Sequence, residues 1–240
     1  MAVLIAEDDQ LHRVFARRIL GEIWSDDGEV YEAANRQEAI RLAQTHEVRR
    51  AILDLQLPDG SGVDVARALW ARRQDTQVLF WSNFADEAYV RSLGRIVPDR
   101  ASYGYLLKSA SEQEMRAALE AVFFKDRRVL DREVRIVQDR ISNRLGGLSD
   151  TEYEGLIDIA LGLTDKIIAQ RRRLSLRGVQ NRLRHLYEKL EIPAGETSHP
   201  PRYNSRTRAV TVALERGLIN LDVLTREQEF LDTWLRRRKV

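Results

Sequence analysis

The first half of this chain alternates short apolar runs with segments of helical periodicity, and this alternation restricts its fold more than any other feature. Strands are predicted at Val3–Ala6, Glu29–Ala33, Arg50–Leu55, Thr76–Trp81 and Ser102–Leu107. Helices are predicted at 10–22, Arg36–Thr45, Val63–Arg73, Asp86–Leu93 and Ser111–Phe124. Continuous apolar runs are typical of parallel strands that are buried on both faces. The pattern therefore predicts five βα units that form an α/β domain with an open, doubly wound, five-stranded parallel sheet of flavodoxin-like type.

Polar residues stand at the carboxyl ends of four predicted strands. Glu7 and Asp8 follow the first strand, Asp54 ends the third, Ser82 follows the fourth and Lys108 follows the fifth. Open α/β sheets bind their ligands beyond these ends. Three converging acids repel one another unless a cation lies among them, and their hard oxygens suit Mg²⁺. The hydroxyl and the ammonium would complete a cradle for a phosphoryl group.

Each of these residues also has an ordinary explanation, because an acid at a strand end is usually a solvated cap. Lys108 argues for the functional interpretation. Of the 15 basic residues in 1–124, 14 are Arg and Lys108 is the single Lys. A chain that prefers Arg so strongly has a compact ammonium here for a reason.

Four segments, LIAEDD, ILDLQLPDGSG, LFWSN and GYLLKS, carry a family resemblance. Residues 1–124 resemble the receiver domain of bacterial two-component response regulators. The resemblance implies that Asp54 accepts a phosphoryl group from a histidine kinase. It further implies that Mg²⁺ is held by Glu7, Asp8, Asp54 and the backbone carbonyl of Gln56.

The same resemblance assigns roles around the phosphoryl group. Lys108 would contact its oxygens, Ser82 would donate a hydrogen bond and shift toward it, and Tyr105 would rotate inward in response. Trp81 departs from the usual pattern, because an aliphatic residue is common before the Ser or Thr. This departure raises a question about packing.

The second half of the chain has the opposite charge. Residues 1–124 hold 15 Lys and Arg against 20 Asp and Glu, whereas residues 125–240 hold 24 against 17. The excess is concentrated in residues 166–189, which hold eight basic residues and one acid. Halves of opposite charge indicate two domains with different partners, the basic one facing nucleic acid.

The segment that joins the halves is predicted to be helical. No Pro or Gly interrupts residues 105–145, so a linker over 125–146 is expected to continue the helix that ends at Phe124. An apolar stripe runs along it at Leu130, Val134, Val137, Ile141 and Leu145. Two interpretations stay open: an amphipathic helix lying on its own domain, or a dimerising coiled coil.

Three helix starts follow a Gly146-Gly147 break. Ser149 and Glu152 form a capping box, Thr164 caps a short helix, and Ser175 caps a longer basic one that runs to about Leu190. A short helix, a tight turn and a basic helix fit a helix-turn-helix.

The segment GLTDKIIAQRRRLSLRGVQNRLRHLYEKLEI resembles the LuxR-type helix-turn-helix of the NarL/FixJ subfamily of response regulators. Residues 204–219 resemble its closing helix, which supports dimerisation in that family. A DNA-binding domain over 147–220 is therefore expected. The resemblance places three side chains at base edges in the major groove: Gln180, Asn181 and Arg184. It places four nearer the phosphates: Thr164, Lys166, Arg177 and His185.

Three features of this half depart from the family. Arg172-Arg173 stands where Leu-Gly is usual, and a non-glycine residue at positive φ costs about 1 kcal/mol. The turn would then be reshaped, or these arginines would contact the DNA backbone. Residues 194–203 look like an insertion. An extra helix over 221–240, capped at Thr225, would pack its apolar face (Phe230, Leu231, Trp234 and Leu235) on its own domain or on a partner subunit.

Two functions compete on these observations. The first is a transcription factor that phosphorylation at Asp54 makes dimeric, so that two recognition helices meet a two-fold site on double-stranded DNA. The second is a receiver-based scaffold with a degenerate helix-turn-helix. An enzymatic output domain is disfavoured, because residues 125–240 contain two histidines and no cysteine. Without a signal peptide or a long apolar run, the expected location is cytoplasmic, with no membrane partner.

Overall fold

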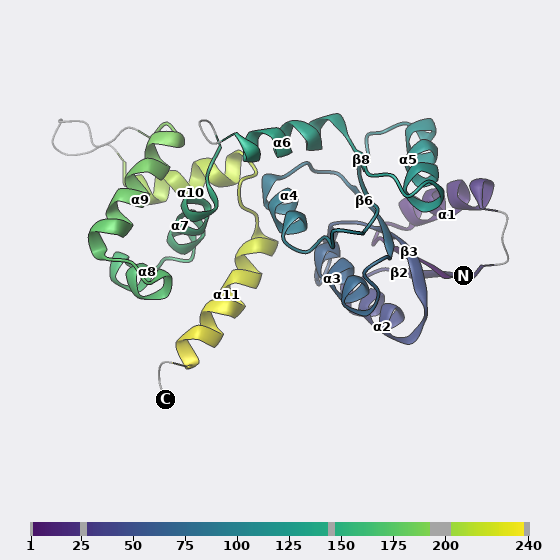
Figure 1. The fold of residues 1–240 in the computed structure, drawn as a ribbon, viewed down its shortest axis with the longest axis horizontal. Helices are drawn as coiled ribbons and strands as arrows, with labels where there is room; N and C mark the ends of the chain where they lie inside the picture. The colour runs from purple at the N-terminus through teal and green to yellow at the C-terminus, as the bar shows by residue number, and fades with distance from the viewer. Residues whose placement is uncertain (1, 25–27, 144–146, 193–202, 238–240) are drawn as a thin grey trace. The chain divides into compact units, whose positions relative to one another are not determined.

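The computed structural model describes residues 2–24, 28–143, 147–192 and 203–237. The chain forms two compact units (Figure 1). The first consists of residues 1–85 and 89–135, and the second of residues 86–88 and 136–240. The domain limits expected from the sequence stay predictions.

The first unit is built on a parallel sheet. Its strands are β1 (Ala2–Ala6), β2 (Val30–Ala33), β3 (Val48–Leu53), β6 (Gln77–Ser82), β7 (Tyr103–Leu107) and β8 (Val129–Leu130). They lie in the order β2-β1-β3-β6-β7-β8, with every pair parallel. The predicted doubly wound sheet is therefore confirmed, with one more strand than the five expected. A separate two-stranded hairpin pairs β4 (Gln56–Leu57) with β5 (Gly60–Ser61).

Five helices accompany this sheet: α1 (Gln10–Ile23), α2 (Arg36–Thr45), α3 (Gly62–Arg72), α4 (Glu87–Gly94) and α5 (Glu112–Phe124). Residues of α1 and α5 form one buried cluster with the strands, and α2 and α3 pack against each other on the other side of the sheet (Figure 1). Side chains of Asp9, Asn35, Ser61 and Ser111 cap four of these helices. Layers on both sides keep β1, β3, β6 and β7 buried, which holds the strand ends in fixed positions.

The continuous linker helix predicted from the sequence is wrong. α5 ends at Phe124, and Asp126 adopts a positive φ of 50°. Val129 and Leu130 then pair with Gly104 and Tyr105 as strand β8, and a new helix, α6, spans Arg132–Ser142. The edge of β7 offers backbone hydrogen bonds to this segment, and no local sequence rule predicts that pairing. Of the apolar stripe, Val134 is buried, and Leu145 lies outside the described residues.

The second unit is helical in its described residues. After the end of α6, its helices are α7 (Asp150–Ala160), α8 (Asp165–Arg172), α9 (Leu176–Lys189), α10 (Ser205–Glu215) and α11 (Leu221–Arg236). The predicted caps at Ser149, Thr164 and Ser175 are confirmed, the first as a complete capping box. All five helices contribute to one apolar core, whose fully buried members include Leu156, Leu186, Ala209 and Ala213.

The N-cap of helix α11 lies five residues earlier than predicted. Its cap is Asn220, whose side chain accepts a hydrogen bond from Val223 N, so the predicted cap at Thr225 is wrong. Val223 and Leu231 are buried, whereas Phe230 is 58% exposed. The helix therefore packs on its own unit along only part of its apolar face. Residues 193–202, which include most of the predicted insertion, lie outside the described part of the chain.

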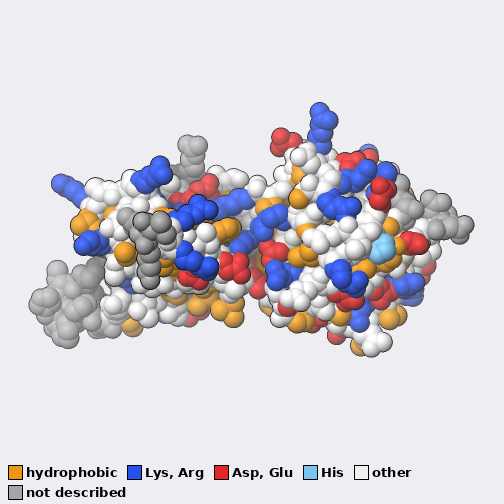
Figure 2. Space-filling model, turned by 90° about the horizontal axis from the view of Figure 1, so that it is seen from below, with side chains coloured by type: hydrophobic (Ala, Val, Ile, Leu, Met, Phe, Trp, Pro, Cys, Tyr) orange, Lys and Arg blue, Asp and Glu red, His pale blue; other side chains and the backbone are white. Residues whose placement is uncertain are grey.

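Charges of both signs are spread over the surface. Figure 2 shows Lys and Arg side chains interspersed with Asp and Glu on both units, so on this face the opposite charges of the two halves do not form single-sign patches. None of the described helices combines the length and the apolarity that crossing a bilayer requires.

Candidate functional site

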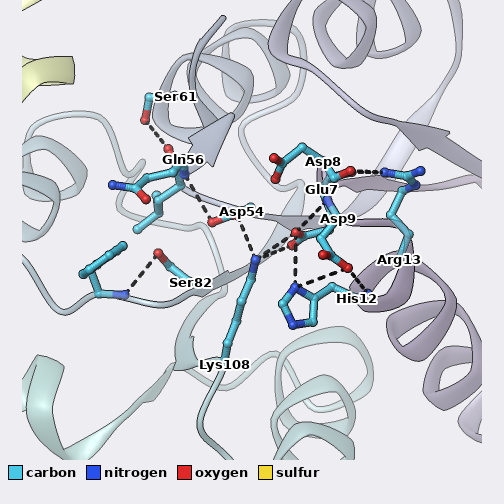
Figure 3. A network of polar contacts seen from close by, with 12 residues as sticks. Glu7, Asp8, Asp9, His12, Arg13, Asp54, Gln56, Ser61, Ser82 and Lys108 are labelled. Carbon is cyan, nitrogen blue, oxygen red and sulfur yellow. Dashed lines mark hydrogen bonds and ion pairs between the residues drawn. The ribbon is translucent and has the colours of Figure 1, made fainter. Parts of the chain in front are cut away.

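Three acids meet at the carboxyl ends of β1 and β3. Glu7 and Asp8 directly follow β1, and Asp54 directly follows β3. One carboxylate oxygen from each lies within 4.8 Å of the others (Figure 3). Asp54 N donates to Ala6 O over 2.8 Å, which continues the pairing of the two strands up to the site. Glu7 and Asp54 are buried and Asp8 is exposed.

Lys108 joins two of these acids. Its Nζ lies 2.8 Å from Asp54 Oδ2 and 2.7 Å from Glu7 Oε2, and its side chain is only 4% exposed. Its backbone N donates to Ser82 O, which fixes the end of β7 against β6. Burial alone would lower the pKa of Lys108, but the hydrogen bonds to Asp54 and Glu7 outweigh burial and raise it. The side chain is therefore a cation at neutral pH.

The donor set fits a hard divalent cation. Burial raises the pKa of Glu7, and the charge of Asp54 adds to the effect, while Lys108 opposes it. One ammonium does not balance three carboxylates, so the cluster keeps a negative excess. Among the described residues no hydrogen bond of good geometry reaches Glu7 Oε2, although Lys108 Nζ is close. Such oxygens are the ligands that Mg²⁺ prefers.

The two neighbouring candidates, Asp9 and Gln56, have local roles. Asp9 caps α1 by accepting from His12 N at 3.0 Å, which agrees with its exclusion from the expected ligand set. Gln56 N donates to Asp54 Oδ1 at 3.2 Å, and this bond orients the Asp54 carboxylate. The predicted use of the Gln56 carbonyl as a ligand stays a prediction.

Ser82 and Tyr105 both contact the loop after β6. Ser82 is fully buried, and its Oγ accepts from Phe84 N at 3.4 Å. Tyr105 is 1% exposed, and its hydroxyl donates to Phe84 O at 2.5 Å. In this structure the Tyr105 ring is thus already turned inward, and the same loop residue binds both side chains.

Trp81 closes the other side of the site. Its indole is buried, stacks on Phe15 and meets the edge of His12 at 5.3 Å. Lys108 Nζ lies 5.5 Å from the ring centroid, within cation–π range. The bulky Trp81 side chain is therefore accommodated by packing against Phe15, His12 and the Lys108 side chain. Sequence reasoning missed His12, whose Nδ1 lies 3.5 Å from Glu7 Oε1, because one histidine in a helix carries no signal.

In the second unit, α8, a tight turn and α9 form the predicted helix-turn-helix. Arg173 ends α8 in the left-handed region, with φ 54° and ψ 48°, where the family pattern has glycine. Leu174 N donates to Ala169 O at 2.8 Å, so the turn closes in spite of the side chain. The turn therefore keeps the conformation expected for the family, and Arg173 adopts the strained positive φ that glycine would adopt without strain.

Arg172 turns into the unit instead of outward. It binds Asp158 through Nε at 2.8 Å, and Arg171 binds the same carboxylate at 2.7 Å. Asp158 is fully buried, and the Arg172 side chain is 18% exposed. Arg172 also pairs with Glu154. An ion-pair cluster between α7 and α8 thus takes the place of a core leucine.

The expected DNA-contacting side chains share one property, which is exposure to solvent. It holds for Thr164, Lys166, Arg177, Gln180, Asn181, Arg184 and His185. The opposite side of α9 is buried through Val179, Leu183 and Leu186. Their contacts with DNA stay predictions.

Comparison with known proteins covers almost the whole chain. Residues 3–120 match the family described as the response regulator receiver domain. The transcriptional regulatory protein YdfI of Bacillus subtilis is 29% identical over 198 residues, covering 80% of this chain and 85% of that protein. The transcriptional activator protein ExaE of Pseudomonas putida is 28% identical over 235 residues, covering 92% and 99%.

A solved structure shares the fold of both units. It is described as the two-component response regulator RcsB–DNA complex, with a TM-score of 0.56 and 19% identity, and the match covers 88% of this chain and 98% of that one. At this identity the likeness concerns the fold alone.

Proposed function

Because the chain belongs to the two-component response regulators, with a receiver domain over residues 3–120, we propose that it is a DNA-binding regulator of transcription controlled by phosphorylation of Asp54. The observation that carries the proposal is the cluster in which Lys108 bridges Asp54 and Glu7, in the same chain as an exposed basic helix. A histidine kinase is the proposed phosphoryl donor. Such a donor and chromosomal DNA both imply a cytoplasmic location.

Asp54 is the nucleophile in this proposal. Its carboxylate oxygen attacks the phosphorus of the donor phosphohistidine, the P–N bond breaks, and an acyl phosphate forms on Asp54. Lys108 Nζ, now 2.8 Å from Asp54 Oδ2, moves with the charge to a phosphoryl oxygen. Bound Mg²⁺, held by Glu7, Asp8, Asp54 and the Gln56 carbonyl, would supply further charge neutralisation.

The readout uses the two side chains that bind the Phe84 backbone. A phosphoryl oxygen competes for the Ser82 hydroxyl, so Ser82 shifts and the Ser82–Phe84 contact changes. Tyr105 holds Phe84 O from the other side and follows the loop. A local electrostatic change thereby alters the surface around α4, which favours a homodimer.

The DNA-binding half of the proposal rests on α9. Gln180, Asn181 and Arg184 are exposed on the side of α9 opposite its buried stripe, as a helix in the major groove requires. Arg184 would pair with guanine, and Gln180 or Asn181 with adenine. Thr164, Lys166, Arg177 and His185 would contact phosphates.

The structure removes the observation on which the scaffold alternative rested. It rested on Arg172-Arg173 disrupting the turn, whereas the turn is closed and Arg172 is accommodated by Asp158. The relatives that match across the chain are named as transcriptional regulators.

The test compares DNA selection with and without Mg²⁺ and beryllofluoride, a phosphoryl mimic. We expect the wild type to enrich one DNA motif and to bind it at least tenfold more tightly with the mimic. Asp54→Asn should bind the motif without responding. Asp9→Asn is the matched control, because it removes an adjacent charge while Asn still caps α1. An equal response in Asp54→Asn, or no response in wild type, would contradict control at Asp54.

A further inference from the structure

The first unit has a second concave site, at the end of the sheet opposite to Asp54. Its volume is roughly 520 Å³, and it lies where β3, β6 and β7 begin. Its lining is mostly charged or polar: Arg49, Arg50, Arg73, Asp75, Gln77, Arg100, Ser102 and Asp126. Because the strands are parallel, this hollow and the phosphorylation site are separated by the length of the sheet.

The lining carries a cationic excess of four arginines over two aspartates. Both aspartates are already engaged: Asp126 accepts from Gln77 at 2.5 Å, and Asp75 lies 3.7 Å from Arg73. Arg50 is fixed by Gln77 at 3.0 Å and by the Phe124 ring, 4.5 Å from its guanidinium carbon. Asp126 keeps its charge when it accepts from a neutral amide, so the two acids offset two of the four arginines and two cations remain in excess.

Arg49 and Arg100 are those remaining cations. Neither makes an ion pair or a side-chain hydrogen bond with any described residue, and both line the hollow. Arg49 is half-buried at the start of β3, and Arg100 is exposed. Two arginines that line one hollow make its electrostatic potential more positive, which favours binding of an anion.

We propose that this hollow binds a small molecule carrying a phosphate group. Guanidinium groups match phosphate oxygens in a two-pronged geometry, and Arg49 and Arg100 have their donors free for it. Gln77 and Ser102 add polar groups at the same place, and the volume is that of a small-molecule site. A hollow of about 520 Å³ suits a small ligand better than an extended acidic peptide.

The test is a titration of the full-length protein, without Mg²⁺, followed by amide chemical shifts. The probes are inorganic phosphate and pyrophosphate at constant ionic strength, with a penta-glutamate peptide as the rival ligand. We expect saturable shifts at Gln77 and Ser102, tighter for pyrophosphate. Arg49→Gln with Arg100→Gln should weaken binding at least tenfold, because each loses a charge-assisted bond.

Matched controls separate this site from the rest of the chain. Arg41→Gln removes an exposed arginine from α2 in the same unit and should leave binding unchanged. The double variant should keep its response to Mg²⁺ and beryllofluoride, which shows that it is folded and makes failure here distinct from failure at Asp54. Unsaturable shifts, equal loss in Arg41→Gln, or preferential binding of the peptide would each overturn the proposal.

Discussion

Lys108 supplies the positive charge in the acidic cluster at the carboxyl ends of β1 and β3. It makes ion pairs with Asp54 and Glu7, and the side chains of all three are buried. Removal of one partner from a buried ion pair leaves charges without compensation and typically costs 3–5 kcal/mol. This residue was predicted from its position after the fifth strand, and its being the single Lys among 15 basic residues in 1–124 strengthened the prediction.

For Lys108→Met we expect the free energy of unfolding to fall by about 3–5 kcal/mol in the absence of divalent cations. Mg²⁺ should restore part of the loss, because it would supply positive charge to the same carboxylates. Urea denaturation with and without Mg²⁺ measures both effects. A loss that Mg²⁺ does not reduce would contradict the cation site at Glu7, Asp8 and Asp54.

Arg173 is a second residue with an expected effect on stability, because its backbone conformation is strained. Its φ of 54° belongs to the region that glycine adopts without strain. Arg173→Gly should therefore raise the free energy of unfolding by up to about 1 kcal/mol. Arg184→Gly, in the middle of α9, should lower it by about 1 kcal/mol. Thermal unfolding distinguishes the two signs, and a destabilised Arg173→Gly would show that the turn carries no strain.

At the scale of elements, a cluster of charges ties three helices of the second unit together. Asp158 of α7 binds Arg171 and Arg172 of α8, and Arg171 also binds Glu227 of α11. The sequence showed Arg172 as a departure from the family. It did not show the partner, because the acid lies 14 positions away and nothing local couples the two.

A double-mutant cycle tests this cluster. Asp158→Ala leaves two guanidinium groups without their buried carboxylate and should cost about 3–5 kcal/mol. Arg172→Leu, which restores the residue common in the family, should cost less. The double variant should be more stable than the sum of the two losses implies, by 1 kcal/mol or more. Additive losses in urea denaturation would show that Asp158 and Arg172 are not coupled.

The elements that were predicted wrongly share a cause. Local spacing and capping rules found the five main strands and the helices of the first unit to within a few residues. They did not find β8, which exists because the edge of β7 offers it hydrogen bonds. Asn220 and Thr225 are both acceptable caps, and the earlier one is used because it lets Val223 reach the core. In both cases, the pairing of β8 and the start of α11, the outcome depends on tertiary contacts that local sequence rules do not include.

At the scale of the whole molecule, affinity for DNA and choice of sequence should respond to different residues. Arg184→Ala should weaken binding to the preferred site by about 1–3 kcal/mol and relax the preference at one base pair. Lys166→Ala should weaken binding to all sequences equally and reduce its dependence on salt. Binding to the selected site and to scrambled DNA, at several salt concentrations, separates the two. Equal behaviour of the variants would contradict the assignment of Arg184 to a base.

Strand β8 also links the edge of the sheet to the segment that leads into α6. Its Leu130 is in register with Tyr105, and Asp131 N donates to Tyr105 O at 2.8 Å, one residue before α6 begins. The backbone of the residue expected to respond to phosphorylation is thus bonded to the chain that leads into the second unit. A displacement of β7 would reach the start of α6 through this main-chain bond and through the Asp131 carboxylate, which accepts from Leu107 N at 3.5 Å and from Glu133 N at 3.1 Å.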